Sequence, residues 1–568
     1  MSPLDLTKTS IQVYVDASTT GEQIMSLVSK TIGTILRERA EKTPDCPGIG
    51  YRDYLYSWKE MDEISDFLAV RYLELGIRKG SHAAIWSVNS PNWVFCFFAL
   101  LKIGAAAVLV NTCYKENELE GILRDNDIEY LFHGYGCKST VYEDLLKKIP
   151  VETLPYLKKI VPLEEEPANK WYQRAGFPLE LSGREKKKLD ERKAEVMPED
   201  TACIMFTSGT TSRPKGVMLS HFSLVNNSAE IARQMRWSQK DKLCISVPLF
   251  HCFGITAGIL CCIHSGAQAH LLKYYKTIDV LEQVQKYRCT VLNGVPTMFL
   301  AILHNQNRSQ YDLSSLESGI IAGSPVLPVE YEEICRELGM KHLQVSYGQT
   351  EASPCIAISD YEDSLELKSH TSGRPIPDIE FAIQQSDATR NESVEGCRKD
   401  VCGRYAGICG EIVVRGYNVM QGYYKRPEET KAAVDPDGWL HTGDLGYVDE
   451  NGYLHVTGRM KEMIIRSGEN ISPAEIENCI IEMPEVEEVK VIGIPAKVLQ
   501  EEIAACIIPK NGAVIDEEKV RSYVKSRLSD YKVPKYVLTF QNFPINASGK
   551  VLSRELRVQA GEMINLKH

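Results

Sequence analysis

The amino-acid sequence predicts an α/β fold: a large N-terminal domain built on α/β sheets, followed by a small α+β domain at the C-terminus. Two features of the first 460 residues support the large domain. Short apolar runs alternate with helical patterns, and glycines with polar side chains follow several of these runs. Such alternation is typical of parallel sheets that helices cover on both faces. After residue 460 the regular alternation stops, which indicates a separate unit.

The first part of the chain shows the alternation most clearly. Apolar side chains recur at steps of three and four over residues 61–75, which predicts an amphipathic helix that ends at Gly76. The apolar stretch 93–110 is long enough to raise the question of a membrane span, but Lys102 and Gly104 interrupt it. We therefore expect a buried helix and then a strand there. The other elements expected in this part are helices at 32–40 and 118–124 and strands at 82–86 and 128–132.

Further along, predicted strands run into loops of small and polar residues. In open α/β sheets ligands bind at the carboxyl ends of the strands, so these loops are expected to line one site. A charge-dense stretch at 183–200 precedes them, and its mixed signs favour a solvated helix over a basic patch for an anionic partner. The strands are expected at residues 201–206, 290–292, 319–322 and 344–346.

The loop at residues 207–216 has the composition of a phosphate-binding loop. Its small residues allow backbone N–H groups to approach phosphate oxygens, its hydroxyl groups add donors, and Lys215 adds positive charge. A polar turn between two strands would have a similar composition, so both interpretations are open at this point. The loop is not a Walker loop, because Pro214 and Gly216 stand where that motif needs Gly and then Ser or Thr.

The C-terminal unit follows a hairpin with an Asn-Gly turn, which is expected at residues 447–456. A helix is then expected to begin at Pro473, with Ser472 as its N-cap and Glu475 closing a capping box. We place the domain boundary near Lys461, which divides the chain into residues 1–460 and 461–568. The remaining elements expected in the small domain are strands at 489–494, 504–508 and 536–540 and a helix at 517–528.

Composition and charge exclude several classes of protein. The chain has 568 residues, of which 43% are hydrophobic and 25% are charged, as is usual for a globular protein of more than one domain. Its net charge of −11 argues against a nucleic-acid binder. The 17 cysteines include no C-x-x-C pair, which favours reduced thiols in the cytoplasm over disulfides or a zinc site. The first 25 residues lack the apolar segment of a signal peptide.

The literal sequence of residues 207–216, T-S-G-T-T-S-R-P-K-G, resembles the phosphate loop of the adenylate-forming superfamily. This superfamily comprises acyl-CoA synthetases, luciferases and the adenylation domains of peptide synthetases, and its loop usually has the sequence T-S-G-T-T-G-x-P-K-G. Ser212 stands where the family has Gly, which leaves its effect on ATP handling open. Five further segments match the family in the right order along the chain.

The resemblance implies a site for ATP and Mg²⁺. Residues 347–351 resemble the family's Y-G-x-T-E, in which Thr350 would bond to the α-phosphate and Glu351 would hold Mg²⁺ together with Thr207. Residues 442–444 resemble T-G-D, whose Asp would bind the ribose hydroxyls. The nucleotide-binding residues that the resemblance implies are Thr207, Ser208, Gly209, Thr210, Thr211, Lys215, Gly323, Ser324, Tyr347, Gly348, Gln349, Asp444 and Arg459.

The resemblance also implies a mobile C-terminal domain that serves both half-reactions. Lys461 occupies the family's hinge position, and Gly468 lies in a segment like the loop that lines the pantetheine tunnel for CoA. Lys550, in Asn-Ala-Ser-Gly-Lys, would be the catalytic lysine that meets the substrate carboxylate and the α-phosphate. His251, in a Pro-Leu-Phe-His-Cys-Phe-Gly string, would flank the acyl pocket and completes the expected catalytic set with Lys550, Thr350 and Glu351.

These matches imply a carboxylate–CoA ligase that forms acyl-AMP from ATP, releases pyrophosphate and then makes acyl-CoA. The strings at 248–254, 323–325 and 531–536 are most similar to the medium-chain acyl-CoA synthetase branch, so the expected partner is a fatty acid. The alternatives are a ligase for aromatic or other bulky acids, an enzyme that transfers its acyl group to a carrier protein, and a nucleotide-binding regulatory protein. We expect no nucleic-acid partner and no membrane span. Peripheral membrane contact and the oligomeric state, a homodimer included, stay open.

A stripe of small residues after His251 leaves the acyl pocket undecided. The stripe has helical spacing, so it would present one face of a helix. That face would either leave room for an aliphatic chain or pack closely against a sheet. Its members are Gly254, Ala257, Gly258, Cys261 and Cys262.

Overall fold

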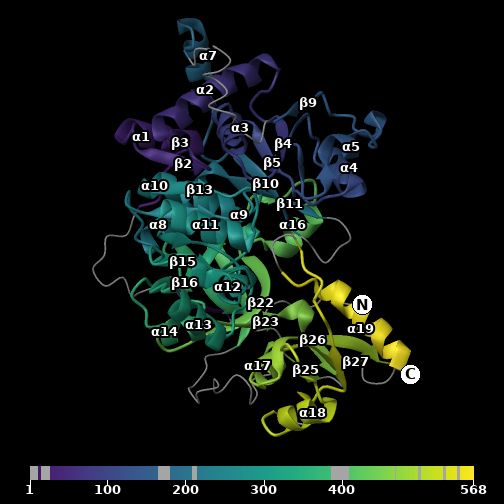
Figure 1. The fold of residues 1–568 in the computed structure, drawn as a ribbon. Helices are drawn as coiled ribbons and strands as arrows, with labels where there is room; N and C mark the ends of the chain where they lie inside the picture. The colour runs from purple at the N-terminus through teal and green to yellow at the C-terminus, as the bar shows by residue number, and fades with distance from the viewer. Residues whose placement is uncertain are drawn as a thin grey trace.

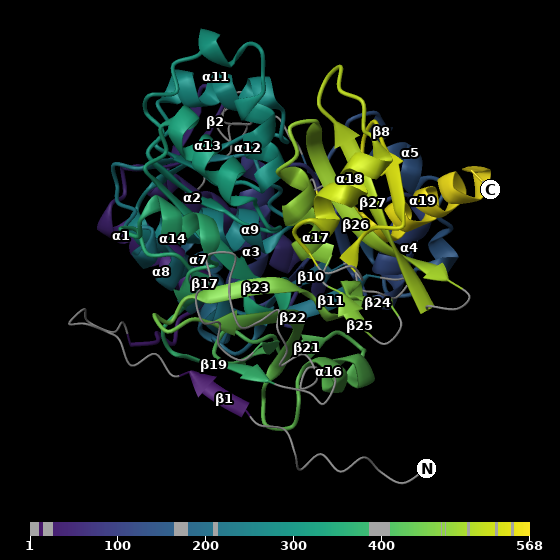
Figure 2. The same cartoon turned by 90° about the horizontal axis from the view of Figure 1, so that it is seen from below.

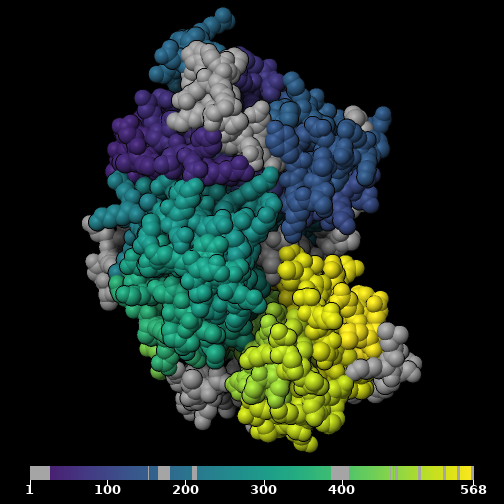
Figure 3. All heavy atoms as spheres, in the orientation of Figure 1, coloured from purple at the N-terminus to yellow at the C-terminus, as the bar shows by residue number. Residues whose placement is uncertain are grey.

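The computed structural model describes residues 11–14, 26–163, 180–207, 214–384, 409–466, 469–471, 473–496, 500–528, 532–546 and 550–567. They form a large α/β part and a smaller α+β part, which confirms the fold class predicted from the sequence (Figure 1). The smaller part, coloured yellow-green to yellow, lies at the lower right of Figure 1. In the space-filling view of Figure 3 it forms a lobe below the blue segments and beside the teal ones.

One sheet of the large part confirms the expected parallel arrangement. In sheet order its described strands are β21 (Gly422–Tyr423), β11 (Lys215–Ser220), β10 (Thr201–Thr207), β5 (Ala106–Leu109), β4 (His82–Trp86), β6 (Tyr130–His133) and β9 (Lys159–Pro162). From β10 to β9 every neighbouring pair is parallel, whereas β11 returns antiparallel to β10. The helices α3 (Pro91–Lys102) and α4 (Glu116–Asp125) connect the parallel strands, as the alternation of patterns predicts.

A second, larger sheet carries most of the remaining strands of the large part. Its described strands, in sheet order, are β18 (Arg374–Pro375), β17 (Cys355–Ile358), β16 (His342–Gly348), β15 (Ser318–Ile321), β14 (Val291–Leu292), β12 (Lys242–Ile245), β13 (Gln268–Leu271), β2 (Pro47–Tyr51) and β3 (Tyr54–Ser57). Helices that accompany it are α1 (Ile32–Lys42), α2 (Trp58–Glu74), α8 (His221–Gln234), α11 (Thr277–Tyr287), α12 (Pro296–Leu303), α13 (Pro328–Leu338) and α14 (Leu365–His370). The predicted strands at 290–292, 319–322 and 344–346 all belong to this sheet.

The apolar stretch 93–110 is a helix and a strand inside the protein. Every residue of α3 is buried, and the four residues of β5 are buried as well. The helix lies in the main core together with residues of α1, α2 and α8. This complete enclosure explains why the stretch has the hydropathy of a membrane segment. In the described part of the chain, no helix combines the length and hydropathy that a membrane crossing requires.

A third sheet lies next to the small part. Its described strands are β1 (Ile11–Tyr14), β19 (Ile379–Gln384), β20 (Gly410–Gly416), β22 (Leu440–Val448) and β23 (Leu454–Arg459). The predicted hairpin is confirmed as β22 and β23, and Gly452 adopts a φ of +83° in its turn. The sequence suggests only a polar leader before residue 32, yet β1 pairs antiparallel with β19 (Figure 2).

Several further elements belong to the large part. They are β7 (Gly136–Cys137), β8 (Thr140–Val141), α5 (Tyr142–Leu146), α7 (Gly183–Ala194) and α16 (Pro427–Ala433). The charge-dense stretch forms α7, in which Leu189 is the buried residue and the lysines 186–188 are exposed. It is therefore the solvated helix that the mixed charges predict.

The smaller part has its own hydrophobic cores. Its described elements are β24 (Ile464–Arg466), β25 (Glu469–Ile471), α17 (Pro473–Ile481), β26 (Val486–Ala496), β27 (Gln500–Pro509), α18 (Glu517–Lys525), β28 (Tyr536–Thr539) and α19 (Ser553–Lys567). One core joins α17 and α18 to one face of the sheet, and a second joins α19 to the other face. The helix predicted to begin at Pro473 is confirmed, whereas the cap at Ser472 lies outside the described residues.

The small residues after His251 lie on a helix that packs against neighbouring elements. The helix runs through α9 (Cys252–Gly254), the π-helical segment η2 (Ile255–Leu260) and α10 (Cys261–Ser265). A Cβ atom on Gly254 would lie 2.2 Å from the carbonyl oxygen of Pro248, and one on Gly258 would lie 3.4 Å from Ile245 Cδ1 in β12. Cys261 Sγ is 3.3 Å from the carbonyl oxygen of Ser228 in α8. These contacts support the close-packing alternative.

We expect Gly254→Ala to destabilise the protein. The added methyl group would meet backbone atoms, which cannot rotate aside as the end of a flexible side chain can. Overpacking of this kind typically costs about 1–3 kcal/mol of unfolding free energy. Gly258→Ala is the matched control: its methyl group meets the end of a flexible isoleucine side chain at 3.4 Å. Thermal and urea unfolding, followed by circular dichroism, should give Gly254→Ala a clearly lower unfolding free energy than both the control and the wild type. Equal stability of the two variants would contradict the close approach.

Candidate active site

The carboxylate of Glu351 is the centre of a polar cluster at the ends of several strands. Glu351 lies in the 3₁₀ turn η4 (Thr350–Ala352), directly after β16. Its Oε1 atom accepts hydrogen bonds from Tyr423 Oη at 2.8 Å and from Oγ1 of Thr207, the last residue of β10, at 3.4 Å. Lys215, the first residue of β11, places its Nζ atom 4.7 Å from the centre of the Tyr423 ring. A carboxylate and hydroxyl oxygens at one point are ligands that suit a hard cation such as Mg²⁺.

Tyr423 is a residue of this cluster that the sequence analysis misses. It lies in β21, where it pairs with Val217 of β11, and its ring is therefore carried alongside the strand that begins at Lys215. Burial, followed by the Glu351 charge, raises the pKa of Tyr423, so the hydroxyl keeps its proton and donates to the carboxylate. Nothing in the local sequence signals this role, because the two partners are 72 residues apart.

A second cluster forms on the hairpin of β22 and β23. Asp444 and Arg459 are direct cross-strand partners, and Arg459 Nε lies 2.8 Å from Asp444 Oδ1. Tyr347, near the end of β16, donates its hydroxyl to Asp444 Oδ2 at 2.8 Å. Burial raises the pKa of Asp444, while the Arg459 charge and the Tyr347 hydrogen bond act in the opposite direction. All three residues belong to motifs singled out in the sequence, and the structure brings them together.

Two glycines of the predicted loops, Gly348 and Gly323, are explained by the backbone: the first by a close contact and the second by a positive φ. A Cβ atom on Gly348 would lie 1.9 Å from the carbonyl oxygen of Pro354, so no larger residue fits. The next residue, Gln349, donates its backbone N–H to that same carbonyl at 3.0 Å. Gly323 follows β15 with a φ of +89°, a conformation that favours glycine, and Ser324 comes next. These turns place η4 and the loop after β15 at the carboxyl ends of neighbouring strands.

His251 precedes Cys252, whose side chain contacts Thr350. The Sγ atom of Cys252 is 3.9 Å from Thr350 Oγ1, and the rings of Phe250 and His251 have centroids 4.6 Å apart. Burial lowers the pKa of His251 to about 4, so its imidazole is neutral at pH 7. It can donate or accept one hydrogen bond there, but it adds no positive charge to a negatively charged substrate.

Lys550 of the small part interacts electrostatically with the Asp444–Arg459 pair. Its backbone N–H donates to Asn546 Oδ1 at 2.9 Å, while its side chain remains accessible to solvent. Desolvation and the Arg459 charge lower the pKa of Lys550, whereas Glu462 and Asp444 oppose this shift. The lysine is thus close enough to feel the charges of the hairpin in the large part.

Some predicted site residues lie outside the described part of the chain. They are Ser208, Gly209, Thr210, Thr211 and Gly468, together with Ser212, where the sequence departs from the family loop. Lys461 lies in the 3₁₀ turn η5 (Met460–Glu462), directly after β23, but its side chain is not described.

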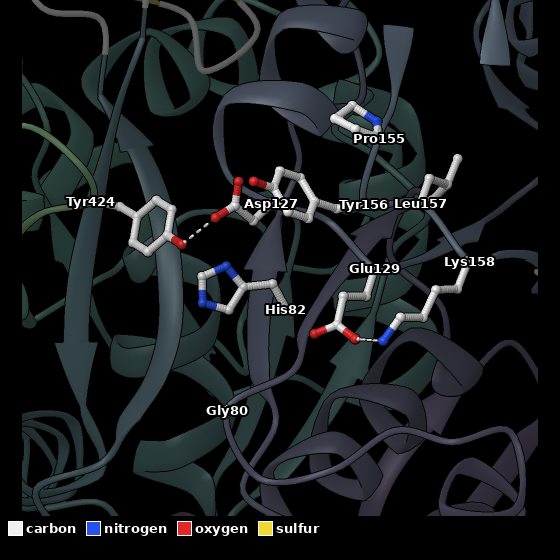
Figure 4. Close-up of a pocket in the computed structure, with 9 residues that line it drawn as sticks. All are labelled: Gly80, His82, Asp127, Glu129, Pro155, Tyr156, Leu157, Lys158 and Tyr424. Atoms are coloured by element: carbon white, nitrogen blue, oxygen red, sulfur yellow. Dashed lines mark hydrogen bonds and ion pairs between the residues drawn. The ribbon is translucent and has the colours of Figure 1, made fainter. Parts of the chain in front are cut away.

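A surface hollow of about 480 Å³ lies near Tyr424, the neighbour of Tyr423 (Figure 4). In it, Tyr424 Oη donates to Asp127 Oδ2 at 2.9 Å, and Glu129 forms an ion pair with Lys158. Its carboxylates are engaged with neighbouring side chains, so the hollow offers no second reaction centre. Its lining residues are Gly80, His82, Asp127, Glu129, Pro155, Tyr156, Leu157, Lys158 and Tyr424.

The fold and two family matches identify an adenylate-forming enzyme. Residues 36–424 match the family "AMP-binding enzyme" and residues 475–550 match "AMP-binding enzyme C-terminal domain". The chain belongs to this family. It is an enzyme of the acid–thiol ligase class, and the family members that it resembles are named acyl-CoA synthetases or ligases.

Three similar proteins place the chain more closely within the family. It is 37% identical to the putative acyl-CoA synthetase YngI of Bacillus subtilis, over 95% of this chain and 99% of that one. It is 33% identical to the mitochondrial medium-chain acyl-CoA ligase ACSF2 of Homo sapiens, over 95% and 89% of the two chains. Among solved structures it resembles o-succinylbenzoate CoA synthetase (MenE) of Bacillus subtilis in complex with an acyl-adenylate, with a TM-score of 0.73, 28% identity and coverage of 94% and 99%.

Proposed function

We propose that this enzyme is an ATP-dependent carboxylate–CoA ligase, which forms acyl-CoA through acyl-AMP and releases AMP and pyrophosphate. The observation that supports the proposal is that β16 links the two clusters: its Tyr347 donates to Asp444 of the Asp444–Arg459 pair, and Glu351 lies in the turn that follows the strand. Lys550 of the small part interacts electrostatically with the same pair. A carboxylate for a cation, a carboxylate for ribose hydroxyls and a lysine from the small domain are the groups that acyl transfer to a nucleotide requires.

The first cluster fits the handling of a triphosphate. Glu351 and Thr207 have the carboxylate and hydroxyl oxygens that would hold Mg²⁺, and Lys215 adds a positive charge beside them. Bound Mg²⁺ supplies charge neutralisation, which allows a weak carboxylate nucleophile to approach the phosphates. In this proposal Ser208, Gly209, Thr210 and Thr211 complete the phosphate loop, and Gly323, Ser324, Gly348 and Gln349 complete the wall of the nucleotide site.

In the first half-reaction, the substrate carboxylate attacks the α-phosphorus of ATP and pyrophosphate leaves. Thr350 donates a hydrogen bond to the α-phosphate, and Lys550 stabilises the charge that develops on its oxygens. Asp444 holds the ribose hydroxyls, while Arg459 and Tyr347 orient the Asp444 carboxylate. His251, neutral at pH 7, flanks the bound acid without adding charge.

In the second half-reaction, the thiol of CoA displaces AMP from the acyl-adenylate. We infer that the small domain, residues 461–568, rotates on the large domain, residues 1–460, about Lys461. The position of this residue in a short turn directly after β23 supports a hinge there, because hinges are commonly a few residues at the ends of elements. The rotation would withdraw Lys550 and bring the Gly468 segment to the site for the pantetheine arm of CoA.

The identity of the acid substrate is the more specific part of the proposal. Similarity to a medium-chain acyl-CoA ligase over almost the whole chain favours a medium-chain fatty acid. Similarity to o-succinylbenzoate CoA synthetase favours an aromatic acid as the second candidate. The proposed location is the cytoplasm, as predicted from the sequence. The described cysteines are free thiols, which is the usual state of cysteine in that compartment.

Product analysis tests the proposal. The full-length enzyme is mixed with Mg²⁺, ATP, CoA and single acids from acetate through long-chain and aromatic ones. We expect AMP, pyrophosphate and an acyl-CoA mass, with the highest rate for medium-chain acids. AMP and pyrophosphate without a thioester would overturn CoA as the acceptor and favour a carrier protein. The absence of pyrophosphate with every acid would overturn the ligase itself.

We expect Tyr423→Phe to weaken Mg²⁺ dependence without removing adenylation. The hydroxyl that orients the Glu351 carboxylate is lost, while the ring beneath Lys215 stays. Loss of a group that orients a metal ligand typically costs about 10–100-fold in metal affinity or activity. Pyrophosphate release, titrated with Mg²⁺, should therefore require a higher concentration for half-maximal rate.

Tyr424→Phe is the matched control for this prediction. It removes a neighbouring tyrosine hydroxyl that also donates to a carboxylate, that of Asp127 at 2.9 Å, in the hollow of Figure 4. Its Mg²⁺ titration should match that of the wild type. If both variants shift equally, the effect belongs to the β21 segment in general and not to the Glu351 contact.

A further inference from the structure

The strand β22 bulges at the Thr-Gly-Asp segment that the proposed function places at the ribose. The register of its pairing with β20 shifts between the pair Glu411–Leu445 and the pair Val413–His441. Between these pairs β20 advances by two residues and β22 by four, so residues 442–444 lie opposite a single residue of β20. Such bulges re-aim a side chain, and they leave backbone groups outside the ladder of strand hydrogen bonds. The bulge therefore needs other partners to hold its shape.

The carboxylate of Glu411 is one of these partners. Its Oε1 atom accepts a hydrogen bond from the backbone N–H of Gly443 at 3.0 Å, and its Oε2 atom accepts one from His441 Nδ1 at 2.9 Å. The hydroxyl of Thr442 is the second partner, because it donates to a carbonyl of β20 at 2.7 Å and accepts from the Asp444 N–H at 3.1 Å. One carboxylate and one hydroxyl thus hold the backbone that carries Asp444.

The imidazole of His441 lies between two carboxylates. Besides its contact with Glu411, its Nε2 atom is 3.7 Å from Asp435 Oδ2, in the turn before β22. The other oxygen of Asp435 accepts from the backbone N–H groups of Trp439 and Asp437 at 2.9 and 3.0 Å, so this carboxylate is held in place. The Glu411 hydrogen bond and the charges of Glu411 and Asp435 raise the pKa of His441, although desolvation opposes them. An imidazolium, which has a proton on each nitrogen, therefore suits this position.

We propose that Glu411 and His441 are positioning residues for the nucleotide, which hold the bulge so that the Asp444 carboxylate meets the ribose hydroxyls. The inference rests on the proposed function, in which Asp444 binds these hydroxyls. Tyr347 and Arg459 each contact one oxygen of that carboxylate and so orient the side chain. The Glu411 bridge acts on the main chain instead, because it binds the N–H of the preceding residue. Loss of Glu411 should therefore misplace the carboxylate even though its direct partners remain.

A nucleotide without ribose hydroxyls tests this role. Pyrophosphate release by the full-length enzyme is measured with ATP and with 2′,3′-dideoxy-ATP, and kcat/KM for ATP is divided by kcat/KM for the dideoxy nucleotide. A hydrogen bond to a charged group contributes about 10–100-fold in binding, so the wild-type ratio should lie in this range. Glu411→Ala should bring the ratio close to unity. Glu411→Gln, which keeps an acceptor for the Gly443 N–H, should give an intermediate ratio. A loss of folded enzyme lowers both rates by the same factor and cancels in the ratio.

Two control variants separate the positioning role from the roles of other residues. Glu380→Ala removes a carboxylate of the same sheet, one that pairs with Arg415, and should keep the wild-type ratio. Asp444→Asn should lower the ratio as Glu411→Ala does. An Asp444→Asn enzyme with the wild-type ratio would overturn the ribose role itself, and this proposal with it. A low ratio in Asp444→Asn together with an unchanged ratio in Glu411→Ala would overturn the positioning role alone.

The pH profile of the same ratio tests the part that His441 plays. Because its pKa is raised, the imidazolium persists above the ordinary value of about 6.5, and its charge is lost as the pH rises past the raised pKa. The Glu411 carboxylate then loses its ionic partner, so the wild-type ratio should decline with rising pH. Ionisations that affect both nucleotides alike cancel in the ratio. His441→Gln, which can still donate to Glu411, should give a ratio that does not vary with pH. A constant wild-type ratio would overturn the role of His441.

Discussion

Lys550→Ala is expected to slow acyl-adenylate formation by about 10²–10³-fold, the range observed when one preorganised donor to a developing negative charge is removed. The lysine lies on the small domain and interacts electrostatically with the Asp444–Arg459 pair of the large one. Because Lys550 is proposed to act in the first half-reaction only, the variant should still convert supplied acyl-AMP and CoA into acyl-CoA at nearly the wild-type rate. Measuring pyrophosphate release and thioester formation separately distinguishes the two steps.

Two further variants make this prediction specific. Lys535→Ala removes another lysine of the small domain, one that pairs with Glu502, and should leave both half-reactions unchanged. Gly468→Phe should have the reverse effect of Lys550→Ala, with adenylation spared and thioester formation blocked, since this segment is proposed to admit the pantetheine arm. Equal loss of both half-reactions in Lys550→Ala and Gly468→Phe would contradict the assignment of the two residues to different steps.

Glu351→Gln is the second variant with a large expected effect. It keeps the shape of the side chain and an oxygen that can accept from Tyr423 Oη, but it removes the negative charge that would hold Mg²⁺. Metal ions stabilise transition-state charge by several kcal/mol, which corresponds to a rate loss of more than about 100-fold. Pyrophosphate release should fall accordingly and should recover in part at high Mg²⁺ concentration.

The control for this variant is Glu380→Gln. Glu380 lies in β19 and pairs with Arg415 of β20 on the surface. The substitution therefore removes the same negative charge, but away from the proposed nucleotide site. Its pyrophosphate release and Mg²⁺ titration should match those of the wild type. A Glu351→Gln enzyme with unchanged Mg²⁺ dependence would refute the metal-ligand role, even if its overall rate were reduced.

Local patterns in the sequence predict most of the secondary structure. The predicted strand at 82–86 coincides with β4, and the predicted helix at 61–75 falls within α2 and the residue that follows it. These predictions succeed because alternation and helical spacing are properties of a single segment. Local patterns do not predict the strand β1, because it is stabilised by pairing with β19, more than 360 residues further along the chain.

The candidate site likewise contains residues that local sequence suggests and a residue that it does not. The sequence alone suffices to propose a set of site residues, because each belongs to a short contiguous motif: Thr207, Lys215, Tyr347, Thr350, Glu351, Asp444, Arg459 and Lys550. Tyr423 is not found, because its contact with Glu351 depends on the pairing of β21 with β11. The sequence also leaves open whether the small residues after His251 line a pocket, and the contacts of Gly254 and Gly258 favour packing.

The sequence by itself determined the class of enzyme and the order of its elements, because chemistry-bearing strings and hydrophobic periods are local. Only the tertiary structure decided which side chains meet: Tyr423 with Glu351, and Tyr347 with Asp444. Each of these contacts joins segments separated by many residues, and their distances depend on strand register and on how the sheets and helices pack. Hydrophobic burial and backbone hydrogen bonding fix that packing for the whole chain at once, so no short stretch of sequence contains it.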